Sequence, residues 1–391
     1  MALFLLVGGA VGGPGLALRE VAREARALTL GGILGARDVF ANLRLRAERG
    51  RAFSAADAGE AAWRRAARGR RGRLAVVTGA NAGVGLALAQ LLTARGVHVI
   101  LGCRSPERGR AALAAVRAAA RGGARAELLA LDLCDGRSVH AFSRAVRARC
   151  GHHRPLDLVV ANAGVMATPW ARTPGAPAAV AGGAPGPPLG GLESQWAANF
   201  AGHFLLVRLL WPALGADARV LLLSSVAHHG GFRPDELRRL AADCAPRAPR
   251  APTAPAARGA HRYSPYAAYK RSKWAMAALA PELQRRAATG AQVVCAVHPG
   301  LVDTALAFGF FRRFVPAPLL RPLQSALLRT PADAARAVLA ALALPPETAA
   351  GAYVVDGRVE RADRVIVRSA AARAAVWDVA SAHVGLPAGT G

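Results

Sequence analysis

The sequence predicts an α/β fold in which helices cover a mostly parallel sheet. From residue 73 onward, short apolar runs alternate with longer helix-like segments. The runs are continuously apolar rather than alternating, as expected of strands that are buried on both faces. The first run also leads directly into a glycine-rich turn and a helix. We therefore expect a single domain with a Rossmann-type, doubly wound parallel sheet of seven strands.

The boundaries of these elements follow from the apolar runs and the turn residues between them. The expected strands cover residues 74–78, 97–101, 127–131, 156–161, 219–224, 292–297 and 352–356. The expected helices cover residues 84–95, 106–121, 136–150, 192–214, 264–288 and 331–343. Two stretches rich in proline, alanine and glycine, 168–191 and 245–260, interrupt this order, and we expect both to be disordered surface insertions.

The chain outside this core divides into three segments. Residues 1–18 carry no charge but hold five glycines and a proline, so we expect a hydrophobic membrane-associating segment, with a cleaved signal or a disordered leader as alternatives. The arginines that follow predict a cytosolic location for the rest of the chain. We expect residues 19–72 to be a basic helical connector, 73–360 to form the domain and 361–391 to be a C-terminal tail.

The positive charge of the chain comes almost wholly from arginine. The 391 residues include 51 Lys+Arg against 24 Asp+Glu, a net charge of +27; only Lys270 and Lys273 are lysines, which leaves 49 arginines. The arginines are spread along the whole chain, which indicates a compositional bias and argues against a nucleic-acid binder. Five widely spaced cysteines without a CxxC pair predict neither a disulfide framework nor a zinc site, and a reducing compartment fits them best.

The first expected strand ends in a turn of the form GxxxGxG, and a helix follows it. The residues of this turn that we expect to bind a cofactor are Thr78, Gly79, Asn81, Gly83, Val84 and Gly85. Such a turn lets the backbone approach a pyrophosphate at the helix N-terminus. A glycine-rich turn alone is a weak signal in a chain with 42 glycines, but its place between a strand and a helix strengthens the prediction.

Further motifs fall at the ends of later strands or in the helices that follow them. They are Asn162-Ala163-Gly164 after the fourth strand, Asn199 in the next helix, Ser225 after the fifth strand, Tyr269 and Lys273 in a YxxxK pair, and Pro299, Gly300 and Thr304 after the sixth strand. With the glycine turn, these motifs cover residues 73–305 and resemble the short-chain dehydrogenase/reductase superfamily. Three of the four asparagines of the chain, and one of its two lysines, occupy motif positions.

The resemblance implies a nicotinamide-dependent oxidoreductase in which Asn199, Ser225, Tyr269 and Lys273 are catalytic. Tyr269 and Lys273 lie four residues apart, so they share a helix face. A unit charge about 4 Å away, at an effective dielectric constant of about 20, is worth roughly 4 kcal/mol. We therefore expect Lys273 to lower the pKa of Tyr269 by about three units, less a part offset by burial.

The implied mechanism gives each of the four residues one task. Tyr269 would exchange a proton with the substrate oxygen, to which Ser225 would donate a hydrogen bond. By resemblance, Tyr269 and Lys273 also contact the cofactor, with Lys273 on the nicotinamide ribose. Asn199 would hold a water that relays protons to Lys273.

The choice of cofactor depends on the residue that follows the second strand. In the family that the chain resembles, a basic residue there favours NADP(H) and an acidic residue favours NAD(H). Arg104 occupies this position, so NADP(H) is favoured and NAD(H) stays open; the alternative is a surface arginine that stands there by chance in an arginine-rich chain. Asp132, after the third strand, resembles the adenine-contacting aspartate of the family, with an ordinary helix N-cap as the alternative. We expect no metal site, because the pair His228-His229 is the arrangement of structural histidines.

Several short segments resemble the retinol-dehydrogenase-like branch, which acts on lipophilic alcohols and aldehydes at membranes. They are 101–109, 202–206, 224–229 and 296–300, and three others, 263–269, 327–335 and 375–386, resemble a member of that branch that acts on polyprenols. The implied substrate is an isoprenoid or other lipid alcohol and its aldehyde, such as polyprenol/polyprenal or dolichal/dolichol, with a retinoid or steroid as the alternative. The implied location is the endoplasmic reticulum membrane or a lipid droplet, with the catalytic domain facing the cytosol and a homodimer left open.

A substrate lid is expected over residues 301–328. This segment holds four of the eleven phenylalanines, Phe308, Phe310, Phe311 and Phe314, and its alternative is a core-packed helix. The alternative function class is a catalytically silent scaffold that binds the cofactor. The complete set of four catalytic residues argues against that class.

Overall fold

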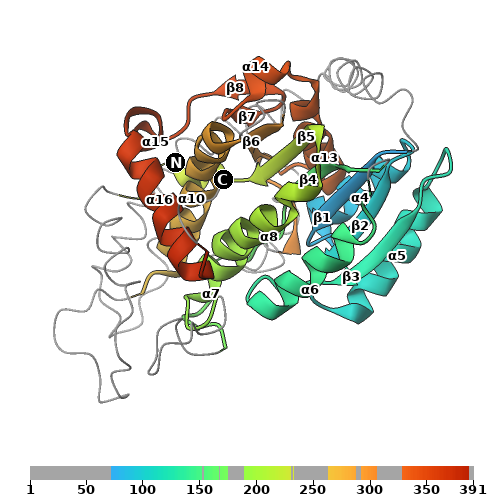
Figure 1. Cartoon of the computed structure of the whole chain (residues 1–391), viewed down its shortest axis with the longest axis horizontal. Helices are drawn as coiled ribbons and strands as arrows, with labels where there is room; N and C mark the ends of the chain where they lie inside the picture. Colours follow the sequence, from blue (N-terminus) through green and yellow to red (C-terminus); the bar gives the residue numbers. More distant parts are fainter. Residues whose placement is uncertain are drawn as a thin grey trace, which may run out of the picture.

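The fold is an eight-stranded sheet covered by helices on both faces (Figure 1). The computed structural model describes residues 72–151, 154–166, 168–174, 189–229, 232, 263–287, 292–305 and 328–386. The strand order in these residues is β3-β2-β1-β4-β5-β6-β7-β8, and every neighbouring pair is parallel except β7 and β8. This arrangement is the doubly wound α/β class that the sequence predicts.

The strands lie where the apolar runs predict them. They are β1 (Leu74–Thr78), β2 (His98–Cys103), β3 (Ala126–Ala130), β4 (Leu156–Ala161), β5 (Leu214–Leu223), β6 (Val293–His298), β7 (Tyr353–Val355) and β8 (Arg358–Glu360). The predicted number of seven is wrong by one, because β8 returns antiparallel along β7. Asp356 and Gly357 form the two-residue turn between them at φ 52° and 71°, the left-handed region that such a turn requires.

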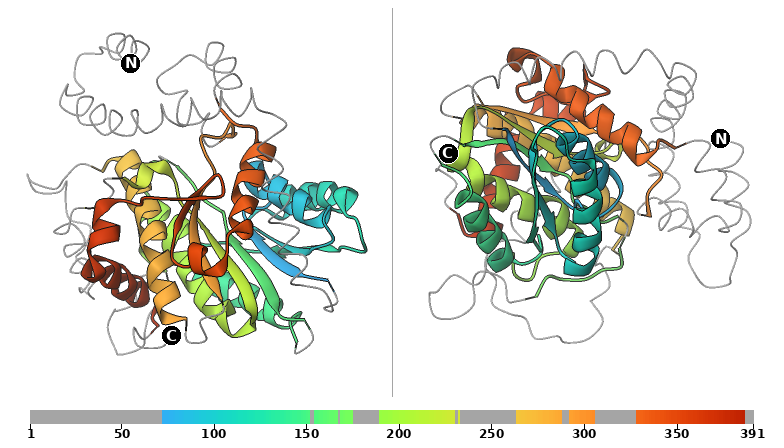
Figure 2. Two further views of the ribbon diagram at one scale, coloured as in Figure 1. Left: turned by 90° about the horizontal axis from the view of Figure 1, so that it is seen from above. Right: turned by 90° about the vertical axis from the view of Figure 1, so that its right-hand side faces the viewer.

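Two groups of helices enclose the two faces of the sheet (Figure 2). On one face lie α4 (Gly83–Thr93), α5 (Pro106–Ala119) and α13 (Pro331–Ala340); on the other lie α6 (Gly136–Arg147), α8 (Gly202–Leu210), α10 (Pro265–Arg286) and α16 (Ala370–Val384). Alternate residues of β1 join the two cores: Leu74 and Val76 one, Ala75 and Val77 the other. Burial on both faces explains why the strand has no polar alternation.

The segment expected to be a C-terminal tail is part of the domain. It forms α15 (Arg364–Arg368) and α16, and α16 packs along α10 and α8 (Figure 1). Trp377 of α16 is 1% exposed, with the Arg208 and Arg286 guanidinium carbons 4.7 and 4.2 Å from its ring centroid. The expected boundary at residue 360 is therefore wrong, because the apolar face of α16 completes the core.

The two described ends of the expected insertion 168–191 are also packed. The Thr173 hydroxyl donates to the Leu189 carbonyl oxygen, and the Leu189 amide donates to the His383 carbonyl oxygen of α16 at 3.1 Å. The Leu189 side chain is fully buried. The prediction of a disordered surface insertion is therefore wrong at these ends, which are anchored to each other and to α16.

Other expectations fall outside the described residues. They are the hydrophobic segment 1–18, the connector 19–72 apart from its last residue, the middle of the first insertion, the second insertion 245–260 and the four phenylalanines of the expected lid. Across the described ranges, no helix combines the length and the hydropathy needed to cross a bilayer. Cys103, Cys134, Cys150 and Cys295 are free thiols.

Candidate active site

The glycine turn between β1 and α4 is shaped to receive a phosphate group. Gly79 and Gly83 adopt φ values of 64° and 54°, which side chains disfavour. A Cβ built on Gly85 would collide with the Gly79 carbonyl and lie 2.5 Å from the Asn162 amide nitrogen. The N-cap residue Ala82 has no capping side chain, so the first amides of α4 stay available to an anion. The turn thus fits a dinucleotide pyrophosphate, with Asn81 before and Val84 within the first turn of α4.

Thr78 and Asn162 tie the ends of β1 and β4 together. The backbone amides of Asn162 and Ala163 both donate to the Thr78 hydroxyl at 2.9 Å, and the Asn162 side-chain amide donates to the Thr78 carbonyl at 2.8 Å. These hydrogen bonds join the carboxyl ends of the two strands. Thr78, Asn162 and Ala163 thereby hold the turn in place at the carboxyl edge of the sheet.

Ser225, Tyr269 and Lys273 come together where β5 ends beside the first turns of α10. The side chains of Ser225 and Tyr269 are hydrogen-bonded. The Lys273 ammonium lies 5.9 Å from the centroid of the Tyr269 ring and donates to the Leu223 carbonyl oxygen at 2.9 Å. Three of the four residues expected to be catalytic thus lie together at one corner of the sheet edge.

Burial sets the pKa of both titratable groups in this corner. It raises the pKa of Tyr269 to about 12, against the Ser225 hydrogen bond, which acts to lower it. It lowers the pKa of Lys273 to about 8. The expectation that Lys273 lowers the pKa of Tyr269 is therefore wrong in this structure, because desolvation dominates and the ammonium bonds to a backbone carbonyl.

Asn199 lies in a π-helical turn, Ala197–Ala201, at the start of α8. Its side-chain oxygen accepts from the Val165 amide at 2.8 Å, and its amide nitrogen donates to the Val165 carbonyl and the Ser272 hydroxyl at 2.9 Å. A Cβ built on Gly164 would lie 3.2 Å from the Asn199 oxygen and 3.5 Å from the Lys273 nitrogen. Asn199 and Lys273 therefore meet at Gly164, and the Asn199 side chain is fully engaged in holding that loop.

Arg104 and Asp132 lie just after β2 and β3, at the same edge of the sheet. Arg104 is exposed, and Ser105 after it caps α5. One carboxylate oxygen of Asp132 accepts from the Cys134 amide at 2.9 Å, whereas the N-cap of α6 is Asp135. The alternative of an ordinary helix N-cap is thus wrong for Asp132, whose carboxylate stands in the loop before the helix.

The loop after β6 closes on the glycine turn. Gly300, after Pro299, has φ 84°, and a Cβ built on it would lie 2.7 Å from the Arg329 Nε atom. Farther along, Thr304 Cγ2 would lie 3.3 Å from a Cβ on Gly83. The loop therefore reaches the glycine turn, as the expected cofactor contact at Thr304 requires.

Some residues of the site were not predicted from the sequence, because they stand in no motif. His203 bridges the Thr78 hydroxyl, at 2.9 Å, and the Asn199 carbonyl oxygen, at 3.1 Å. Arg329 packs behind Gly300 and forms an ion pair with the half-buried Asp356. The motif Asp356-Gly357 is a hairpin signal that could have revealed β8. Nothing in the sequence distinguishes Arg329 from the other arginines of the chain, which number 49 in all.

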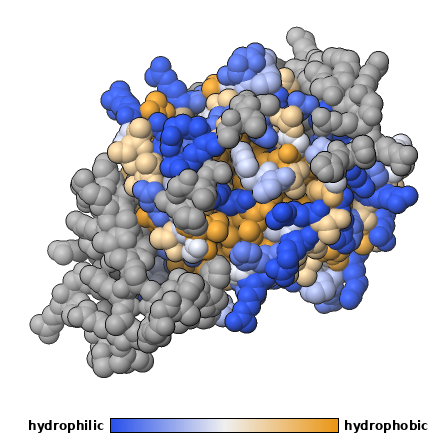
Figure 3. Space-filling model, viewed as in Figure 1, coloured by the Kyte–Doolittle hydropathy of each residue, from blue (hydrophilic) through white to orange (hydrophobic). Residues whose placement is uncertain are grey.

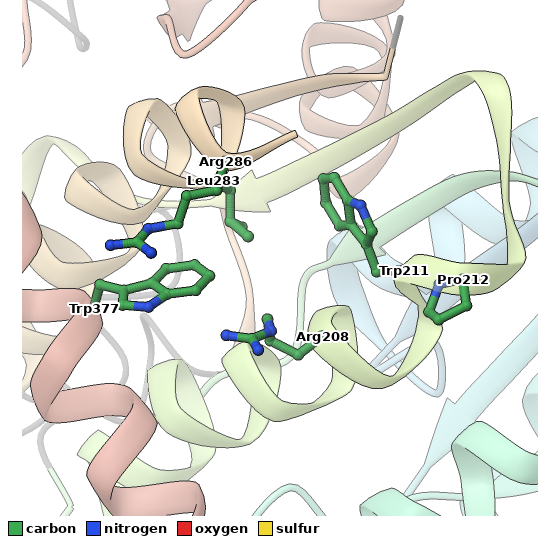
Figure 4. Close-up of a pocket in the computed structure, with 6 residues that line it drawn as sticks. All are labelled: Arg208, Trp211, Pro212, Leu283, Arg286 and Trp377. Atoms are coloured by element: carbon green, nitrogen blue, oxygen red, sulfur yellow. The ribbon is translucent and has the colours of Figure 1, made fainter. Parts of the chain in front are cut away.

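A cavity of about 120 Å³ lies far from this corner (Figure 4). It is lined by Arg208, Trp211, Pro212, Leu283, Arg286 and Trp377. Arg286 is 17 residues beyond Tyr269 on α10, about 25 Å at 1.5 Å per residue. This cavity belongs to the packing of α16 and not to the site at the strand ends.

Comparisons with known proteins point to the same chemistry. The family model described as "short chain dehydrogenase" matches residues 73–233. A polyprenol dehydrogenase from Danio rerio is 31% identical over 297 residues, covering 73% of this chain and 79% of that protein. Retinol dehydrogenase 12 from Bos taurus is 36% identical over 162 residues, 41% of this chain and 45% of that protein. The crystal structure of an uncharacterized protein from Mycobacterium Paratuberculosis has a TM-score of 0.55 at 30% identity and covers 80% of this chain and 94% of that one.

Proposed function

Because this chain belongs to the short-chain dehydrogenase family, we propose that it interconverts a hydrophobic alcohol and its aldehyde by hydride exchange with a nicotinamide cofactor. The fold class, the family and the oxidoreductase class predicted from the sequence are confirmed. The observation that carries the proposal is the hydrogen-bonded Ser225–Tyr269 pair beside Lys273, at the edge of the sheet that also bears the glycine turn.

The residues at this edge supply a cradle for a dinucleotide. The glycine turn and the α4 amides would receive the pyrophosphate, Asp132 would contact the adenine, and Arg104 would favour the 2′-phosphate of NADP(H) over NAD(H). Pro299, Gly300 and Thr304 close the other side. When bound, the nicotinamide supplies or accepts the hydride.

The chain's own residues carry out the proton transfer to the substrate oxygen. A Tyr269 pKa of about 12 keeps the phenol protonated at neutral pH, the form that donates to the oxygen of an aldehyde under reduction. Ser225 donates a hydrogen bond to the same oxygen as negative charge develops on it. Lys273 donates to the Leu223 carbonyl oxygen and would contact the nicotinamide ribose of a bound cofactor, and Asn199 holds the loop at Gly164 and Val165 beside the lysine.

The proposed substrate class is isoprenoid: polyprenol and polyprenal, or dolichal and dolichol. The support is the relative named polyprenol dehydrogenase, which this chain matches over most of both sequences. A retinoid is the alternative that the relative named retinol dehydrogenase supports, and a steroid is the third lipid to include.

The test is a product-resolved screen of the purified full chain with NADPH and NADH against polyprenal, retinal, a ketosteroid and a short aldehyde. We expect turnover of the isoprenoid with NADPH, and loss of at least about 10³-fold in kcat for Tyr269→Phe, which removes the proton donor. NADPH binding without turnover of any alcohol or aldehyde would contradict the proposal, as would full activity of Tyr269→Phe.

The proposed partner surface is a cytosolic membrane face, of the endoplasmic reticulum or a lipid droplet. Among the described residues, support comes from β8 and α15, where Val359 is 48% and Val367 60% exposed. Exposed arginines at 358, 361, 364 and 368 surround them. Apolar side chains between cations suit a surface of anionic lipids.

A further inference from the structure

We infer that His228 is a positioning residue through which the C-terminal segment holds the loop of Ser225. The inference rests on the proposed function, in which Ser225 acts on the substrate oxygen. His228 is fully buried in the 3₁₀ turn Val226–His228, three residues after Ser225. Its Nδ1 atom lies 2.7 Å from the Ser225 carbonyl oxygen, and its Nε2 atom lies 3.1 Å from the Asp363 amide nitrogen.

The two partners fix the tautomer of the ring. A backbone amide only donates, so Nε2 accepts the hydrogen bond from Asp363. The ring proton is then on Nδ1, where it donates to the Ser225 carbonyl oxygen. Burial lowers the pKa of His228 to about 3, so the ring stays neutral and keeps one donor and one acceptor. Neither nitrogen is left for a metal or for proton exchange with a substrate, which makes the role one of positioning.

Asp363, the partner of His228 in the C-terminal segment, is itself held by further hydrogen bonds. Asp363 is buried and is the N-cap of α15, where its carboxylate accepts from the Val365 amide at 2.9 Å. The same oxygen accepts from the Trp274 indole at 3.2 Å. Trp274 is fully buried on α10, directly after Lys273. The backbone amide that Asp363 offers to His228 is therefore fixed against the helix that carries the catalytic tyrosine and lysine.

Ser225, the other partner of His228, lies in the loop that carries the catalytic hydroxyl. Ser225 begins the 3₁₀ turn in extended conformation, its hydroxyl accepts from the Ala227 amide at 3.2 Å, and its side chain bonds to Tyr269. The 3₁₀ turn itself gives the Ser225 carbonyl oxygen one bond, from the His228 amide at 3.0 Å. The bond from the His228 ring to the same oxygen adds the restraint that ties the turn to Asp363, and catalysis is sensitive to sub-ångström shifts of such groups.

The experiment compares His228→Leu, which removes both bonds, with His228→Asn, whose amide nitrogen replaces Nδ1 as a donor. For His228→Leu we expect kcat to fall about 10- to 100-fold, while the Kd for NADPH changes less than about twofold. His228→Asn is expected to regain most of that loss. His140→Asn is the matched control: it replaces a half-buried histidine of α6, a helix that carries no catalytic residue, and it should keep the wild-type kcat.

Two results would overturn the inference. One is an unchanged kcat in His228→Leu; the other is an equal loss of kcat and NADPH affinity in both His228 variants, which indicates only general disruption of the fold. Wild-type turnover is measured first, so an inactive wild type counts against the proposed function instead. A nitrogen-15 NMR spectrum of histidine-labelled full chain needs no turnover: we expect a neutral His228 protonated at Nδ1, and protonation at Nε2 would contradict the bonding pattern.

Discussion

At the scale of single residues, the competition between burial and charge decides how Tyr269 works. A lysine four residues away on the same helix face would lower the pKa of the phenol if its ammonium lay in contact with the hydroxyl and if burial did not desolvate the phenolate. In the structure the Lys273 ammonium is bonded to Leu223, and desolvation raises the pKa of Tyr269 to about 12. The protonated phenol is therefore the resting form, and the base form is scarce.

This pKa predicts opposite pH dependences for the two directions of the reaction. Reduction needs the phenol and the charged Lys273, and both are present below about pH 7, because the pKa of Tyr269 is about 12 and that of Lys273 about 8; its single-turnover rate constant should therefore be flat from pH 5 to 7. Oxidation needs the phenolate, whose fraction rises about tenfold per pH unit below the pKa, so its rate constant should rise over that range. Stopped-flow absorbance of the nicotinamide measures both, and a flat oxidation rate would contradict the pKa of about 12.

Arg104 offers a second prediction at this scale. Arg104→Asp should raise the KM for NADPH about 10- to 100-fold, the worth of one or two charge-assisted hydrogen bonds, and should leave the KM for NADH within about threefold. Arg108→Asp is the control, because Arg108 is equally exposed one turn farther along. Equal effects of the two substitutions would indicate a general field of positive charge rather than a phosphate contact.

The roles of single residues were predictable only where a motif marks them. The tyrosine, lysine, serine and asparagine of the site stand in spaced patterns, and their positions at one sheet edge agree with that expectation. His203 and His228 bond to the same loops but carry no pattern, since their partners are backbone groups far away in sequence. The pKa of Tyr269 could not be read from spacing, because burial depends on the whole fold.

At the scale of elements, apolar runs located the parallel strands well, because each is buried on two faces. They failed for β8, whose three residues are exposed and whose only signal is the turn at Asp356 and Gly357. They also failed for α16, whose alanine-rich sequence has weak amphipathic periodicity. A π-helical turn such as Ala197–Ala201 has no sequence period to reveal it.

The glycine turn gives a prediction for one such element. Gly85→Ala should weaken NADPH binding at least about tenfold, because the new methyl group collides with the Gly79 carbonyl and the Asn162 amide. Fluorescence titration of NADPH measures the effect. Gly151→Ala is the matched control: no atom lies within 4 Å of the added methyl group, and its NADPH affinity should equal that of the wild type. Wild-type affinity in Gly85→Ala would exclude the turn as the pyrophosphate site.

The packing of α16 gives a second prediction for an element. Trp377→Ala should lower the free energy of unfolding by about 3–5 kcal/mol, since the indole is buried between two guanidinium groups. Trp170→Ala should change it by less than about 0.5 kcal/mol, because Trp170 is 55% exposed. Chemical denaturation followed by circular dichroism compares them. Equal small changes would mean that α16 contributes little to the stability of the domain.

At the scale of the whole molecule, the arginines are spread along the chain, so their number alone does not mark a binding surface. Figure 3 shows hydrophilic residues spread among apolar ones over the face that it draws. Against that background, the surface of α15 stands out because Arg364, Val367 and Arg368 lie on one helix face and all are exposed. The N-cap of this helix, Asp363, bonds to the loop of Ser225 through His228, so α15 lies beside the active site.

Docking of the enzyme on a membrane through α15 predicts that its arginines contribute to vesicle binding. Each arginine near an anionic bilayer contributes about 1 kcal/mol, so Arg364→Glu with Arg368→Glu should weaken binding to phosphatidylserine-containing vesicles at least about 30-fold. Arg108→Glu with Arg110→Glu, exposed on α5 across the sheet, should bind vesicles as the wild type does. Vesicle co-sedimentation measures binding. Turnover of a short, soluble aldehyde should stay unchanged in both pairs, because neither touches the catalytic corner. Wild-type vesicle binding by the α15 pair would assign membrane contact to another part of the chain.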